Sequence, residues 1–166
     1  MGDYKPISDY DLHKKTLQMI KSRGVEINDI AQLVYFLQSK YFPDITIEEC
    51  EHNVNKVLEK REVQNAVITG IELDILAEKK LLDSPLQEII WHDESLYGID
   101  EIIALSIVNV YGSIGFTNYG YIDKLKPGIL EKLNSHTDGK INTFLDDIVG
   151  AIAAAASSRI AHSQTR

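Results

Sequence analysis

The stretch FLDDIVGAIAAAASS, residues 144–158, decides the fold of this chain. After its two aspartates it carries no charge, and small glycine, alanine and serine side chains dominate it. A helix that is apolar around its whole circumference is buried in the protein interior. We therefore predict a central helix that runs toward His162, is surrounded by the other helices, and has Thr143 as its N-cap.

Cap and stop signals predict further helices along the chain. They place helix starts at Ser8, Asn28, Thr46, Glu62, Ser84 and Asp100, and helix ends near Gly24, Pro43 and Trp91. Pro85 is expected at the first position of its helix. Segment 100–120 is rich in glycine and is either a broken helix or a helix pair, whereas 135–142 is expected to be a polar loop. Because no strand pattern appears, we predict a compact all-α fold of seven or eight helices.

Length, charge and cysteine content restrict the class of protein. The 166 residues fit a single domain, in which an N-terminal helical part, 1–61, precedes a core, 62–166. The net charge of -8 argues against a nucleic-acid partner, because binding to the phosphate backbone requires a basic surface. The single Cys50 excludes an internal disulfide bond and fits a reducing cytoplasm.

No segment predicts a membrane span or a secretory signal. The longest uncharged run, Ile102–Phe116, is shorter than the ~20 residues that a helix needs to cross a bilayer. The N-terminal residues contain acids and lack an apolar segment of the kind found in signal peptides. We therefore expect no transmembrane segment and a cytoplasmic location.

Acidic residues border apolar helical segments at three places. These are Asp100–Glu101, Asp123 and Asp146–Asp147, and Lys126 follows the second of them. Burying a carboxylate is unfavourable unless a metal ion, a cationic partner or hydrogen bonds compensate its charge. Oxygen ligands of this kind suit Mg²⁺ or another hard divalent cation. The pattern indicates a divalent-metal site, and such sites most often act on phosphate.

Structural explanations remain open for several of these residues. Asp146 has the spacing of a capping box with Thr143, and Asp100 could be an N-cap or a first-turn residue of its helix. Asp123 and Lys126 are three residues apart and could simply form an ion pair on one helix face. Asp74 lies on the apolar stripe of its predicted helix and is a weaker candidate for the site.

The sequence lacks the motifs of other enzymes that act on phosphate. The chain has no GxxxxGK[ST] loop and no GxSxG motif, and Cys50 has no arginine six residues after it. What remains is the attack of a metal-activated water molecule on phosphorus, with carboxylates holding the metal.

Three segments then resemble a known family. The blocks DEIIALSIV from Asp100, YIDKLKPG from Tyr121 and FLDDIVGAIAAA from Phe144 resemble, in order and spacing, the signature blocks of the phosphatidylglycerophosphatase A family, and in particular its soluble, YutG-like branch. The resemblance covers roughly Gln64 to Ser158. It implies an all-α fold and the Mg²⁺-dependent hydrolysis of phosphatidylglycerophosphate to phosphatidylglycerol and phosphate.

The resemblance also implies roles for individual residues. The acids that would bind metal or act as base are Asp100, Glu101, Asp123, Asp146 and Asp147. Among them, Asp100 and Asp147 would be catalytic, together with Lys126, which would contact the phosphate. The substrate would be phosphorylated and could be a phospholipid headgroup, reached by peripheral contact with the inner face of the membrane.

The chain also departs from the family pattern. It lacks the early Gly-Thr-x-Gly-Ser block, and it has Gly120 where the membrane enzymes carry arginine. A catalytically inactive binding or regulatory module of the same fold is therefore an alternative. A further alternative is an all-α nucleotide pyrophosphohydrolase, which would use acids spaced like Glu48 and Glu51. The N-terminal helices could support a homodimer or a higher homo-oligomer.

Overall fold

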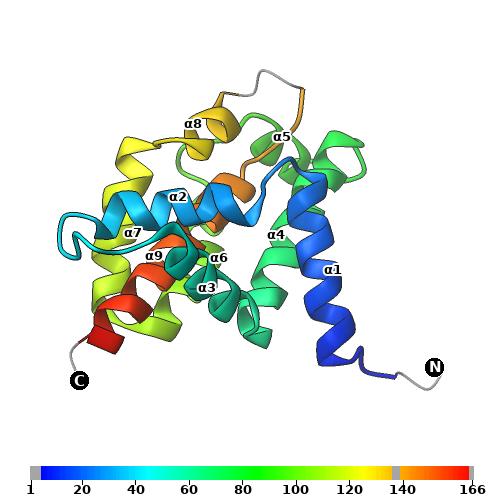
Figure 1. Ribbon diagram of the computed structural model, residues 1–166. Coiled ribbons are helices and arrows are strands. Elements are labelled where there is room, and N and C mark those ends of the chain that lie inside the picture. Colours follow the sequence, from blue (N-terminus) through cyan, green and yellow to red (C-terminus); the bar gives the residue numbers. More distant parts are fainter. Residues whose placement is uncertain (1–4, 136–138, 165–166) are drawn as a thin grey trace.

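The computed structural model describes residues 5–135 and 139–164 (Figure 1). These residues form nine α-helices and one 3₁₀ helix, with no β-strand among them, which confirms the predicted all-α fold. The helices are α1 (Asp9–Ser22), α2 (Ile27–Gln38), α3 (Ile47–Leu58), α4 (Arg61–Glu78), α5 (Leu86–Trp91), α6 (Ile99–Val108), η1 (Asn109–Tyr111), α7 (Ser113–Leu125), α8 (Ile129–Asn134) and α9 (Leu145–Gln164). Part of the expected polar loop, residues 136–138, lies outside the described ranges.

Helix α9 is the centre of the fold. It contacts α2, α3, α4, α6, α7 and α8, and Figure 1 shows it enclosed by the other helices. Every residue from Ile148 to Ser158 is buried. The small side chains of this segment leave room for neighbours on all sides, so the prediction of a central small-residue helix is confirmed.

The start of α9 is capped by a side chain from another helix. The carboxylate of Asp74, in α4, accepts hydrogen bonds from the backbone N–H groups of Phe144 and Leu145, each at 3.1 Å. The first N–H groups of a helix have no partner within the helix, and here the helix starts where water does not reach. Asp74 is fully buried and supplies the missing acceptor.

The predicted Thr143 cap is therefore wrong. The Thr143 hydroxyl donates instead to the carbonyl of Ile90, at 2.7 Å. The capping box with Asp146 does not form either, because the Asp146 N–H donates to the Asn142 carbonyl at 3.3 Å. The start of α9 is thus capped by an acceptor 70 residues away in the chain, and not by the local Thr143–Asp146 pattern.

Several other boundaries are as predicted. Ser8 caps α1 by accepting from the Asp11 N–H, and Thr46 and Glu49 form the expected capping box of α3. The glycine-rich segment is a helix pair, because α6 and α7 are separated by η1 and by Gly112, whose φ is 81°.

Three boundaries differ from the prediction. Helix α2 begins two residues earlier than expected, because Glu26 rather than Asn28 is its N-cap, and ends at Gln38 rather than just before Pro43. Pro85 is the N-cap of α5 and not its first helical residue. Helix α8 was not predicted, because six residues are too few to display a helical period.

No helix within residues 5–135 and 139–164 is long and apolar enough to cross a membrane.

The contact between α4 and α9 depends on Gly70. A Cβ atom at this position would lie 2.4 Å from Ile148 Cδ1 and 2.9 Å from Phe144 Cβ. We expect Gly70→Ala to lower the free energy of unfolding by about 1–3 kcal/mol, because it overpacks a closed core. Gly120→Ala is the matched control: this helical glycine has open space around it, so the alanine should stabilise by about 0.5–1 kcal/mol. Urea unfolding measures both, and equal values would contradict the packing argument.

Loss of the Asp74 cap should also destabilise the fold. Asp74→Ala leaves the N–H groups of Phe144 and Leu145 buried without an acceptor, which should cost about 1–3 kcal/mol. Asp74→Asn keeps one side-chain oxygen and should lose less. Chemical unfolding of the two variants tests this order, and an alanine variant as stable as the parent would show that the cap contributes nothing.

Candidate active site

Three helix termini that carry the predicted acids meet at one cavity. The start of α6, the end of α7 and the start of α9 surround a cavity of about 220 Å³. The structure places all six predicted site residues around it: Asp100, Glu101, Asp123, Lys126, Asp146 and Asp147. We call this cavity, with the side chains that line it, the acidic pocket.

Lys126 is at the centre of the acidic pocket. Its Nζ lies 2.7 Å from Asp123 Oδ1, 2.8 Å from Asp146 Oδ2 and 3.4 Å from Asp147 Oδ1. The residue is the C-cap of α7 and has a left-handed backbone with φ 45°. The expected ion pair with Asp123 is present, but the same ammonium also joins α7 to α9.

Burial and charge act in opposite directions on Lys126. Desolvation by burial works to lower its pKa, whereas the charge of Asp146 and the hydrogen bond to Asp123 work to raise it. The net effect holds the pKa of Lys126 above its ordinary value, so the side chain keeps its positive charge.

Asp146 and Asp147 are both nearly inaccessible to solvent, with 6% of each residue exposed. The N–H of Asp147 donates to Asp146 Oδ1 at 2.9 Å, which fixes the Asp146 carboxylate at the first turn of α9. Burial, followed by the charge of Asp146, raises the pKa of Asp147 to about 8. Burial also raises the pKa of Asp146, although the charge of Lys126 opposes this shift. One ammonium does not fully compensate two buried carboxylates.

Asp100 enters the pocket from α6. Gly98 is the N-cap of that helix and Asp100 is in its first turn, so of the two structural explanations the first-turn position is confirmed and the N-cap is not. Its Oδ1 atom is buried and has no hydrogen-bond partner. Burial raises the pKa of Asp100, and the charge of Asp93 adds to the shift. An unpartnered carboxylate oxygen facing other acids is what a cation would satisfy.

The acids are not arranged as a ready-made metal site. In the part of the chain that the structure describes, no group of three or more His, Cys, Asp or Glu side chains could hold a metal ion as placed. Lys126 Nζ lies between Asp123, Asp146 and Asp147 and takes their oxygen atoms as its own partners. The donors are nevertheless all carboxylate oxygens, which suits a hard cation such as Mg²⁺.

Several residues of the pocket carry no recognisable motif in the sequence. Asp93 and Glu94 come from the loop between α5 and α6, and Asn134 comes from α8. The charge of Asp93 acts on both Asp100 and Asp146. Its position shortly before the glycine that starts α6 was the available signal.

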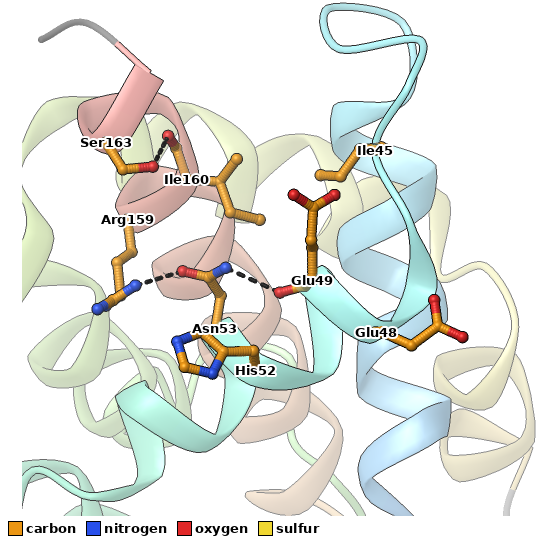
Figure 2. A pocket seen from close by; sticks show the side chains of 8 residues that line it. All are labelled: Ile45, Glu48, Glu49, His52, Asn53, Arg159, Ile160 and Ser163. Atoms are coloured by element: carbon orange, nitrogen blue, oxygen red, sulfur yellow. Dashed lines mark hydrogen bonds between the residues drawn. The ribbon is translucent and has the colours of Figure 1, made fainter.

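A second cavity, of about 390 Å³, lies between α3 and the C-terminal part of α9 (Figure 2). Asn53 bridges it, accepting from Arg159 at 2.5 Å and donating to the Glu49 carbonyl at 2.8 Å. Glu48 lines this cavity, whereas Glu51 accepts a hydrogen bond from Asn28 in α2. The two glutamates spaced as in pyrophosphohydrolases therefore have separate surroundings, and neither lines the acidic pocket.

Comparison with known proteins identifies the family. A model of the family described as phosphatidylglycerophosphatase A matches residues 16–162. The chain belongs to this family. The match begins in α1, so it includes the N-terminal helices, which the resemblance from residue 64 onward did not cover.

Two relatives and a solved structure align with nearly the whole of this chain. YutG of Bacillus subtilis (strain 168) is 67% identical over 151 residues, which cover 91% of each chain. YpjQ of the same strain is 61% identical over 148 residues, covering 89% of this chain and 83% of YpjQ. The crystal structure of the low temperature requirement C protein from Listeria monocytogenes matches with a TM-score of 0.93 and 64% identity, covering 96% of this chain and all of that one.

The raised pKa of Asp147 predicts how the stability of the metal-free protein depends on pH. An acid whose pKa rises on folding, here from an ordinary ~4 to about 8, favours the folded state at low pH and loses that contribution as the pH approaches 8. In EDTA, Asp147→Asn should therefore be more stable than the parent at about pH 8, and the gain should shrink toward about pH 5. Urea unfolding at both pH values measures the difference.

The matched control is Asp44→Asn, which changes an exposed acid outside the acidic pocket. This variant should not show the pH-dependent gain. An Asp147→Asn variant less stable than the parent at the higher pH would contradict the electrostatic description of the pocket.

Proposed function

We propose that this protein is a metal-dependent phosphatase that hydrolyses a phosphate monoester, with phosphatidylglycerophosphate as substrate. The products would be phosphatidylglycerol and inorganic phosphate. One observation carries the proposal: carboxylates from α6, α7 and α9 line a single pocket, in which those of α7 and α9 contact Lys126. Family membership supports the same reaction class.

The carboxylates would hold Mg²⁺ or another hard divalent cation. The candidate ligands are Asp100, Glu101, Asp123, Asp146 and Asp147. The unpartnered Oδ1 of Asp100 and the excess of acid over base in the pocket support this assignment. When bound, the cation would supply positive charge to the oxygen atoms of the phosphate.

Lys126 would bind the phosphate. Its ammonium group has three N–H donors, and in the structure it is directed at three carboxylates. A cation bound to those carboxylates would compensate their charge in its place. Lys126 could then turn its donors toward the phosphate oxygens without leaving the acids unpaired.

Asp147 would be the general base, and its raised pKa suits that role. A raised pKa makes the Asp147 carboxylate, once it has lost its proton, a stronger base toward water than an ordinary aspartate. The water molecule loses a proton to Asp147 as its oxygen bonds to phosphorus, and the ester P–O bond breaks. The leaving alkoxide takes a proton from solvent, and Asp147 returns its proton to solvent.

Phosphate release from phosphatidylglycerophosphate in mixed micelles tests the proposal. We expect release in Mg²⁺ and none in EDTA. Asp147→Asn should lower turnover by about 10²–10⁴-fold, the usual contribution of a general base. Asp44→Asn, an exposed acid outside the pocket, should keep the parent's activity.

Two other outcomes are informative. Release from water-soluble phosphate monoesters but not from the lipid would keep the reaction and replace the substrate. A parent protein that releases no phosphate from either class and binds no Mg²⁺ would reject the phosphatase function and favour the inactive binding module.

A further inference from the structure

The hydroxyl of Tyr119 lies buried next to the acidic pocket and has no hydrogen-bond partner. Only 6% of the residue is exposed. Tyr119 is in α7, one turn before Asp123, so these two side chains lie on one face of that helix, which ends at the Lys126 C-cap. This helix packs against α9.

The Tyr119 ring lies against the first turns of α9. Its Cε2 atom is 3.8 Å from where a Cβ atom on Gly150 would lie. Cε2 is bonded to the ring carbon that bears the hydroxyl, so this end of the ring faces α9. Gly150 is one turn beyond Asp146 and Asp147, and the hydroxyl is therefore close to the turn that carries both aspartates.

The charged groups that act on the Tyr119 hydroxyl are carboxylates of the acidic pocket. Burial raises the pKa of the Tyr119 hydroxyl, and the charge of Asp147, followed by that of Asp123, raises it further. Both residues line the acidic pocket. The hydroxyl therefore keeps its proton and can act as a donor, and the charged groups that act on it are carboxylates, which are acceptors.

We propose that Tyr119 is the positioning residue of Asp147: its hydroxyl donates a hydrogen bond to the Asp147 carboxylate once a bound cation replaces Lys126 as the partner of that carboxylate. This inference rests on the proposed function. Among the three carboxylate contacts of Lys126, the one to Asp147 is the longest, at 3.4 Å, and is the easiest to give up. The new hydrogen bond would fix the carboxylate in the orientation that serves the metal and the attacking water.

Tyr111 offers a matched control. Its hydroxyl is also buried and also lacks a hydrogen-bond partner. The charges that act on it are those of Arg159, Glu62 and Glu59, and none of these residues lines the acidic pocket. Tyr111→Phe therefore removes the same chemical group from a comparable environment without affecting the pocket.

The test measures Mg²⁺ binding by calorimetry and phosphate release for the parent, Tyr119→Phe and Tyr111→Phe. We expect Tyr119→Phe to bind Mg²⁺ about 10-fold more weakly, as is typical when a hydrogen bond to a metal ligand is removed, and to lower kcat with little change in KM. Its thermal midpoint in EDTA should equal or exceed that of the parent, because an unpartnered buried hydroxyl is lost. Tyr111→Phe should match the parent in Mg²⁺ affinity and in kcat.

A double-mutant cycle with Asp147→Ala, which removes both side-chain oxygens at this position, shows whether Tyr119 acts through Asp147. Four other carboxylates remain in that background, so Mg²⁺ binding is weakened but still measurable. Tyr119→Phe should have no further effect on Mg²⁺ affinity there, because the residue it positions is gone. Binding is measured at a temperature where circular dichroism shows every variant folded, so a loss of stability does not imitate a loss of affinity.

Two results would overturn the assignment of Tyr119. One is a Tyr119→Phe variant with the parent's Mg²⁺ affinity and kcat, and the other is an equal loss of affinity with and without Asp147. A parent that binds Mg²⁺ but releases no phosphate would contradict only the hydrolase function, and the affinity comparison would still decide the role of Tyr119. A parent that does not bind Mg²⁺ would reject both.

Discussion

The buried carboxylate of Asp74 holds the start of α9, and both the core and the acidic pocket depend on where that helix starts. The first N–H groups of a helix that begins inside a protein need acceptors that water cannot supply. Asp74 provides them from α4, while Arg23 binds the segment just before α9 through the Ile141 carbonyl, at 2.6 Å, and the Asn142 side chain, at 3.0 Å. These contacts fix the two aspartates that follow.

The acidic pocket lowers the stability of the fold, because it buries carboxylates close to one another. Burial places Asp146 and Asp147 side by side with Lys126 as their only direct cationic partner among the described residues, and it raises the pKa of Asp147 to about 8. A stable core alone would not gather so many acids at one place. The arrangement is explained if a cation and a phosphate complete it, which is the basis of the proposed function.

The sequence predicts the central helix of the fold better than it predicts the contacts that position the site. The uncharged run 148–158 was enough to predict a central helix, because no surface position suits such a segment. Local signals also located the caps at Ser8 and Thr46. They failed at Thr143, where the actual acceptor is Asp74, because contacts between distant helices leave no spacing pattern in the sequence.

The sequence by itself determined the helical class, the buried central helix and the acids beside apolar segments, since these follow from periodicity and from the energetics of burying charge. The tertiary structure alone decided that Lys126 joins Asp123 to Asp146 and that Asp93 belongs to the same pocket. It also decided that the Tyr119 hydroxyl lies beside them without a partner. The physical reason is that such contacts depend on how α6, α7 and α9 pack together, and packing is set by the shape of the whole core rather than by neighbours in the chain.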